Sequence, residues 1–129
     1  MNASHAHAGL LFAVDDDHHV GDFIVRVARR AHYEAHAIDS GLELIRRLAE
    51  NPDVILLDLT MPEFDGMQTI AALSNASYRG RLIIASGNDP DDVDKACAFA
   101  KTRGMRLTGS LRKPFRVSQL LEMLALPEH

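Results

Sequence analysis

Cysteine is almost absent from this sequence: Cys97 stands alone, so no disulfide can form within the chain. Small secreted domains often depend on several disulfides, and a lone thiol suits a reducing compartment. Long hydrophobic runs are missing too, because no stretch approaches the roughly 20 apolar residues that cross a bilayer. Residues 1–8 lack the positive segment and apolar stretch of a secretory signal. These absences predict a cytoplasmic protein that does not enter a membrane.

An excess of positive charge is also missing, since the formal net charge is −4. This balance argues against a broad basic face, so we expect no direct binding to nucleic acid. The 129 residues fit one domain, and 47% hydrophobic with 25% charged residues is an ordinary globular composition. We expect residues 1–8, rich in His and Ala, to form a disordered tail and residues 9–127 to form the domain.

Short apolar runs alternate with longer amphipathic segments along the chain. Continuous apolar runs, typical of strands buried on both faces, lie at 10–14, at 54–57 before Asp58 and at 82–85 before Ser86. Weaker strand signals lie at 33–38 and 105–111. Apolar residues at helical spacing follow each run, at 20–31, 44–48, 67–74, 93–100 and 117–124. Strict alternation of this kind predicts an α/β fold with a parallel sheet and helices on both faces.

Local signals mark several boundaries of these elements. Ser40 and Glu43 have the spacing of a capping box, which predicts the start of a helix. Asp89 is a favourable N-cap for the fourth helix, and Gly104 is placed to end it. Residues 61–66 have the composition of a loop.

Polar side chains stand at the carboxyl ends of four predicted strands: Asp15 and Asp16, then Asp58, then Ser86, then Lys113. Functional crevices of such sheets lie outside these ends, where the strand order reverses. If the first and third strands are neighbours, the acids converge, and carboxylates about 4 Å apart repel by about 4 kcal/mol at an effective dielectric of about 20. Such a cluster holds a proton or binds a cation, and hard oxygen ligands favour Mg²⁺, with Mn²⁺ acceptable. Carboxylates, a divalent ion, a hydroxyl and a lysine together suit phosphoryl transfer.

These residues resemble the receiver domains of response regulators in two-component (His-Asp) phosphorelay systems. The resemblance extends from about residue 10 to residue 126. It is carried by four motifs in the correct order, each closing the correct strand: 14–17, 58–62 with 65–66, 85–87 and 113–115. The family implies a flavodoxin-like three-layer α/β/α fold, with five parallel strands in the order 2-1-3-4-5 and five helices.

The resemblance also implies a metal site. Asp16 matches a direct Mg²⁺ ligand, and Asp15 matches a ligand that can act through a water molecule. Asp58 and the backbone carbonyl of Thr60 complete the protein's share of the coordination. The ion would cancel the repulsion that a phosphoryl group meets among aspartates.

The phosphoryl chemistry that the family implies centres on Asp58 as the phosphoacceptor. The donor is a phosphohistidine of a sensor histidine kinase or a histidine phosphotransfer protein, or a small phosphodonor. Lys113 would pair with the phosphoryl group, and the Ser86 hydroxyl would move toward it. Gly87 leaves room above the acceptor for an imidazole or a water. The family implies no enzymatic activity beyond the domain's own phosphorylation and dephosphorylation.

Two positions depart from the family pattern. Receivers commonly carry Tyr or Phe three residues before the lysine, where this chain has Ser110, so the usual aromatic switch is absent. The residue two after the Lys-Pro pair, often acidic or a hydroxyl that caps the last helix, is Arg116. Residues 104–111 resemble a variant found in receivers joined to cyclic-di-GMP phosphodiesterase domains. The family also implies a cis bond between Lys113 and Pro114.

Three other functions compete with a phosphorylated receiver. A Mg²⁺-dependent phosphohydrolase with an aspartyl-phosphate intermediate shares the residue types, but it usually has its nucleophile on the first strand and a second Asp two residues on, where this chain has Thr60. A flavodoxin-like FMN binder is disfavoured because Asp15, Asp16 and Asp17 would repel the FMN phosphate. A pseudo-receiver that is never phosphorylated and acts as a binding module is the third.

The remaining polar or sulfur-containing residues have simpler interpretations. Asp17 is expected to cap the first helix, and His18 and His19 to be exposed on its first turn rather than to bind metal. Cys97 and Met67 are expected to pack in the core. The sequence allows a homodimer, and it names neither the kinase nor the downstream partner. The first helix presents three arginines, as a solvated face or a partner contact: Arg26, Arg29 and Arg30.

Overall fold

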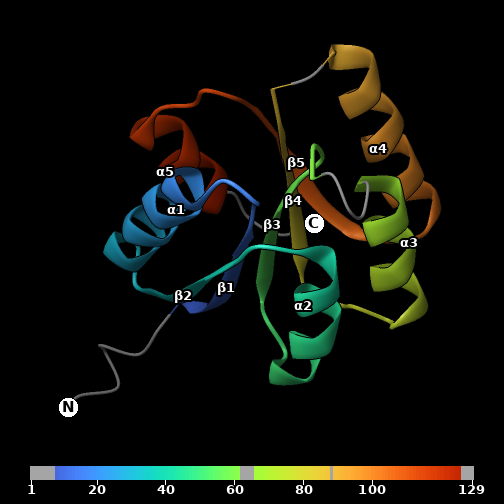
Figure 1. Cartoon of the computed structure of the whole chain (residues 1–129), viewed down its shortest axis with the longest axis horizontal. Coiled ribbons are helices and arrows are strands. Elements are labelled where there is room, and N and C mark those ends of the chain that lie inside the picture. The colour runs from blue at the N-terminus through green and yellow to red at the C-terminus, as the bar shows by residue number, and fades with distance from the viewer. Residues whose placement is uncertain (1–7, 62–65, 88, 126–129) are drawn as a thin grey trace.

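The computed structural model describes residues 8–61, 66–87 and 89–125. It confirms the predicted alternation, and Figure 1 shows the sheet between two layers of helices. The strands are all parallel and lie in the predicted order β2-β1-β3-β4-β5. The strands are β1 (Gly9–Val14), β2 (Tyr33–Ile38), β3 (Val54–Asp58), β4 (Arg81–Ser86) and β5 (Arg106–Arg112). The helices are α1 (His18–Arg30), α2 (Gly41–Arg46), α3 (Gly66–Asn75), α4 (Pro90–Thr102) and α5 (Val117–Ala125).

The side chains of successive residues in each central strand pack on opposite faces of the sheet, because side-chain direction alternates along a strand. In β1, Leu11 and Ala13 belong to the core cluster shared with α1 and α5. Phe12 and Val14 belong to the cluster shared with α2, α3 and α4. Figure 1 shows these two groups of helices on opposite sides of the sheet. The central strands are therefore apolar on both faces, which is why they appear in the sequence as continuous apolar runs.

The predicted helix caps are confirmed where the structure describes them. The Ser40 side chain accepts a hydrogen bond from the Glu43 N–H at 3.1 Å. Asp17 caps α1 by accepting from the His19 N–H at 2.9 Å, and Asp89 caps α4 by accepting from the Asp91 N–H at 2.9 Å. Gly104 follows α4 with a φ of +76°, a conformation that favours glycine. The second helix is shorter than its apolar spacing suggests, because after Arg46 the chain tightens into a 3-10 turn, η2 (Arg47–Glu50).

Arg81 is a buried cation whose position the sequence does not reveal. Its guanidinium donates hydrogen bonds to the Thr108 hydroxyl at 3.0 Å and to the Met123 and Leu124 carbonyls at 3.1 and 3.4 Å. Those carbonyls lie in the last turn of α5, where a helix leaves backbone acceptors unsatisfied. Arg81 thus ties the start of β4 to the end of α5.

The expectation that Met67 packs in the core is wrong. The buried face of α3 comprises Gly66, Thr69, Ile70 and Leu73, and the Met67 side chain falls beside it with 39% of its surface exposed. Cys97 does pack against the apolar cluster, half-buried.

Parts of the predicted loop and tail lie outside the described residues. In the loop, Met61 is buried and Gly66 already begins α3, while 62–65 are not described. In the tail, only Ala8 is described, and its N–H donates to the His32 carbonyl at 2.8 Å. Among the described helices, each falls short of the length and apolarity that a bilayer crossing requires.

We expect Ser40→Ala to lower the free energy of unfolding by about 1 kcal/mol, because it leaves the Glu43 N–H without its cap. Urea unfolding followed by far-UV circular dichroism should show a lower midpoint with an unchanged slope. Ser40→Asp, which keeps an accepting oxygen at the cap, should stay close to the native protein. An unchanged midpoint in Ser40→Ala would contradict the capping role.

Candidate functional site

Strand register brings the predicted acids to one edge of the sheet. Val14 in β1 lies beside Leu57 in β3, so Asp15 and Asp58 leave the two neighbouring strands at the same level. On the other side, Asp58 lies beside Ala85 in β4, which places Ser86 one residue beyond it. The strand order reverses between β1 and β3, which is where sheets of this kind have their functional crevice.

Asp15, Asp16 and Asp58 form a cluster that could hold a metal ion. Each offers a carboxylate oxygen, and these oxygens all lie within 4.8 Å of one another. Asp15 and Asp58 are 3% and 1% exposed, whereas Asp16 is exposed. Charges at that separation repel by about 3–4 kcal/mol at an effective dielectric of about 20. An all-oxygen donor set with this repulsion fits a hard divalent cation.

The two carboxylate oxygens of Asp58 have different surroundings. Oδ1 accepts hydrogen bonds from the Thr60 N–H at 3.1 Å and from the Thr60 hydroxyl at 2.7 Å. Oδ2 is buried and has no hydrogen-bond partner within the described residues. Leaving such an atom unsatisfied costs about 1–3 kcal/mol. The lone pairs of Oδ2 are therefore not used by the described residues, which fits a position beside a cation.

Thr60 does more at this site than the sequence suggested. Its backbone carbonyl was the expected contribution, yet its N–H and hydroxyl both hold Asp58 in place. The signal in the sequence is a hydroxyl residue two positions after the acid, a spacing at which side chain and backbone commonly bond locally.

Lys113 links the two buried acids. Its Nζ lies 2.6 Å from Asp15 Oδ2 and 3.2 Å from Asp58 Oδ1. Burial alone would lower the pKa of the Lys113 ammonium, but the hydrogen bond to Asp15 and the charge of Asp58 outweigh it and raise that pKa. Lys113 is therefore a charged partner shared by both carboxylates.

Both carboxylate oxygens of Asp15 accept hydrogen bonds, and its pKa is nevertheless raised. Its Oδ1 accepts from the Asp17 N–H at 2.9 Å, and its Oδ2 contacts Lys113. Burial raises the pKa of Asp15, and the Asp58 charge adds to this, while the bonds from Lys113 and the Asp17 N–H oppose it. Desolvation prevails, so the Asp15 carboxylate is relatively easy to protonate.

Ser86 lies at the end of β4 and is 1% exposed. Its carbonyl accepts from the Lys113 N–H at 2.9 Å, which fixes the lysine backbone against β4. A Cβ added to Gly87 would first meet the Lys113 Cβ at 3.8 Å, an ordinary contact, and Gly87 itself is exposed. The Lys113–Pro114 bond is cis, as expected.

The positions that depart from the family pattern also have structural counterparts. Ser110 is exposed and lies in the wall of a hollow beside Ser86. The Arg116 N–H donates to the Gln119 side chain at 2.7 Å, so Gln119 supplies a cap at the start of α5. His18 and His19 are exposed, as predicted, and His18 lies 3.6 Å from Asp39, outside the acid cluster.

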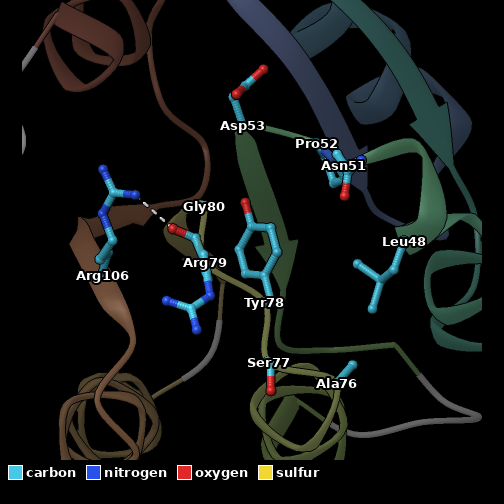
Figure 2. A pocket seen from close by; sticks show the side chains of 10 residues that line it. All are labelled: Leu48, Asn51, Pro52, Asp53, Ala76, Ser77, Tyr78, Arg79, Gly80 and Arg106. Atoms are coloured by element: carbon cyan, nitrogen blue, oxygen red, sulfur yellow. Dashed lines mark hydrogen bonds between the residues drawn. The ribbon is translucent and has the colours of Figure 1, made fainter.

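Figure 2 shows a larger hollow, of about 530 Å³, at the opposite edge of the sheet, where the strands begin. The Arg106 side chain donates to the Arg79 carbonyl at 2.6 Å, and the two guanidinium groups extend away from each other. The Tyr78 hydroxyl donates to the Arg81 carbonyl. Of the ten described residues that line this hollow, only Asp53 is acidic. Two bases, Arg79 and Arg106, also line it, whereas the acid cluster of Asp15, Asp16 and Asp58 lies at the other edge.

We expect Asp58→Ala to raise the free energy of unfolding by about 1–2 kcal/mol in the presence of a metal chelator, because it removes a buried charge from a repulsive cluster. Thermal unfolding provides the measurement. Asp58→Asn, which keeps the shape but removes the charge, should shift the melting temperature in the same direction. Lower stability in both variants would count against the electrostatic account.

Known proteins with sequences similar to this chain include a chemotaxis protein and a response regulator. The chain is 30% identical over 118 residues to the chemotaxis protein CheY of Listeria monocytogenes, covering 88% of this chain and 93% of CheY. It is 41% identical over 92 residues to the nitrate/nitrite response regulator protein NarL of Escherichia coli, covering 70% of this chain and 39% of NarL.

Solved structures match over most of their length. A response regulator from Colwellia psychrerythraea superposes with a TM-score of 0.79 at 25% identity, covering 89% of this chain and 92% of that chain. The chemotaxis protein CheY4 of Vibrio cholerae superposes with a TM-score of 0.76 at 26% identity, covering 92% and 97%. Residues 11–125 match the family described as the response regulator receiver domain. With the strand order and the clustered acids, this match shows that the chain belongs to the response regulator receiver domains of two-component systems.

Proposed function

We propose that Asp58 is the phosphoacceptor of this receiver domain and that it takes a phosphoryl group from a phosphohistidine. The donor is a sensor histidine kinase or a histidine phosphotransfer protein. The observation that carries the proposal is a buried carboxylate with one hydrogen-bonded oxygen and one free oxygen, facing a lysine at the crevice. Members of this family are signalling modules, so the stored group serves to alter the surface of the domain.

The transfer requires one bond to form and one to break. A carboxylate oxygen of Asp58 attacks phosphorus, and the P–N bond of the phosphohistidine breaks with its electron pair left on the imidazole nitrogen. Thr60 keeps the Asp58 carboxylate in one orientation through two hydrogen bonds. Lys113, 3.2 Å from Asp58 Oδ1, neutralises negative charge on the transferred oxygens.

The proposed cofactor is Mg²⁺, and Mn²⁺ can replace it. Asp15, Asp16, Asp58 and the backbone carbonyl of Thr60 would hold the ion, and the orphaned Oδ2 of Asp58 fits such a role. When bound, the ion supplies positive charge against the carboxylates and the phosphoryl oxygens. Without it, a phosphoryl dianion would enter a site that already contains mutually repelling acids.

Ser86 is the proposed reporter of phosphorylation. It is buried at the end of β4, next in sequence to the residue that pairs with Asp58. A short hydroxyl can donate to a new phosphoryl oxygen by rotating, and the accompanying shift of β4 reaches the surface.

An apolar hollow beside Lys113 is the proposed docking place for the donor. Val20 and Phe23 of α1 face Pro114 and Phe115 across it, and its volume is about 350 Å³. The Phe23 and Phe115 rings lie 6.0 Å apart. A helix that carries the donor histidine can bury apolar side chains there while its imidazole approaches Asp58. The exposed arginines of α1 would meet acidic residues at the rim of such an interface.

Incubation with acetyl phosphate or phosphoramidate and Mg²⁺, followed by intact-mass measurement, tests the proposal. The native protein should gain the mass of one phosphoryl group, and Asp58→Ala should gain none. Ser118→Ala, on the exposed surface of α5, is the matched control and should be modified normally. No added mass, under conditions that modify another receiver, would favour a pseudo-receiver. Many turnovers of phosphate release from phosphomonoesters would favour a phosphohydrolase.

We also expect Mg²⁺ affinity to fall as the pH is lowered, beginning above the pH at which an ordinary aspartate protonates. The carboxylates must be deprotonated to bind the ion, and burial raises the pKa of Asp15. Isothermal titration calorimetry between about pH 7 and pH 5 measures this dependence. Asp15→Asn should bind more weakly at pH 7 and show a flatter pH dependence. If the Mg²⁺ affinity of the native protein does not change across this pH range, the assignment is contradicted.

A further inference from the structure

The hollow of about 530 Å³ where the strands begin has the size of a ligand site (Figure 2). Its walls come from three segments: η2 with the turn before β3, the connection from α3 to β4, and the first residue of β5. Strand register brings these segments together, because Arg81 of β4 pairs with Val54 of β3 on one side and with Arg106 of β5 on the other. Small-molecule sites in proteins usually have volumes of about 300–1,000 Å³.

Tyr78 forms a fixed aromatic wall of this hollow. Its hydroxyl donates to the Arg81 carbonyl at 2.9 Å, and its half-buried ring packs against the apolar cluster on one face of the sheet. Gly80 allows this position, because a Cβ added there would overlap the Tyr78 hydroxyl oxygen. Figure 2 shows the ring between the lining arginines on one side and Asn51 and Pro52 on the other. A fixed ring beside an apolar wall can stack against a flat ring of a ligand.

Two arginines give one side of the hollow a positive charge. Arg106 is held in place, because its guanidinium donates to the Arg79 carbonyl at 2.6 Å. The Arg79 side chain is exposed, and among the described residues its guanidinium has no hydrogen-bond or ion-pair partner. It can therefore turn toward an anion beside Arg106. A guanidinium pairs well with phosphate oxygens because its N–H donors form a planar fork.

Asp53, the one acid among the described lining residues, is engaged away from the arginines. Its Oδ2 accepts from the Leu10 N–H at 2.7 Å, and a Cβ added to Gly9 would lie 2.7 Å from the same oxygen. The Asp53 carboxylate is thus directed toward β1, whereas the two bases belong to the β4 and β5 side of the sheet. An anionic group is therefore favoured beside Arg79 and Arg106.

We propose that this hollow binds a small organic phosphate that carries a flat ring, the chemistry of a mononucleotide. The phosphate pairs with Arg79 and Arg106, and the ring lies along Tyr78 and Pro52. A ligand in this position contacts three segments that are separate in sequence. The site lies at the opposite ends of the strands from Asp58 and needs neither a metal ion nor a phosphorylated aspartate, so it is independent of the proposed function.

The 5′-monophosphates of adenosine, guanosine, cytidine and uridine are the probes, each titrated into the ¹⁵N-labelled full chain with a metal chelator present. The chelator keeps Mg²⁺ from carrying a phosphate to the cluster around Asp58. At least one mononucleotide should give saturable amide NMR shifts centred on Tyr78, Gly80 and Arg106. The proposal is overturned if none of them gives saturable shifts up to about 10 mM, or if the shifts centre on Asp58.

Fragments of the mononucleotide that binds best separate the two halves of the site. Its nucleoside, which lacks the phosphate, should bind at least about tenfold more weakly, because the charge-assisted hydrogen bonds to arginine are lost. Ribose 5-phosphate, which lacks the base, should bind several-fold more weakly because it has no ring to place along Tyr78. Equal affinities of nucleoside and mononucleotide would overturn the role of the arginines. Equal affinities of ribose 5-phosphate and mononucleotide would overturn the role of the ring.

Arg79→Gln removes one of the two bases without breaking a side-chain contact among the described residues, and it should raise the dissociation constant of the mononucleotide about tenfold. Arg116→Gln makes the same change at an exposed position near the other ends of the strands and should leave that constant unchanged. Equal affinities of Arg79→Gln and the native protein would contradict the proposal. The fragment comparisons need only the native protein, so they decide the matter even if a variant perturbs the fold.

Discussion

Mutual repulsion among Asp15, Asp16 and Asp58 is the constraint on which the rest of the site depends. Two of these carboxylates are buried, and the energy of their repulsion is comparable to a substantial part of the stability of a domain this size. Lys113 offsets it in part by contacting both buried acids. The remaining imbalance makes the site receptive to a divalent cation. A phosphoryl group then adds negative charge that the same cation and lysine can neutralise.

The sheet can hold these repelling acids together because its stability does not depend on them. β1 and β3 are paired over four residues before Asp15 and Asp58 emerge, and apolar clusters cover both faces. The energy that maintains the site therefore comes from burial elsewhere in the domain. In the proposed function, a change of charge at this edge reorients the Ser86 and Lys113 side chains while the paired strands stay in register, which suits a module that signals by small shifts at its surface.

Patterns with a clear physical cause were predictable from the sequence. Continuous apolar runs gave the buried strands, and their alternation with helices gave a parallel sheet whose carboxyl ends collect Asp58 and Lys113. Contacts that depend on side-chain direction were not predictable. Thr60 donates two hydrogen bonds to Asp58, and Arg81 donates hydrogen bonds to carbonyls of α5 that are distant in sequence. Met67 has the apolar character of a core residue, but its position on α3 lies beside the buried face and leaves 39% of its surface exposed.

Anomalous diffraction from crystals grown with Mn²⁺ locates a bound ion without assuming its ligands, and it tests the central claim most directly. The account predicts one strong peak within coordination distance of Asp16 and Asp58, with Lys113 remaining within reach of the same carboxylates. A peak at another cluster, such as His18 and Asp39, with none beside Asp58, would contradict it.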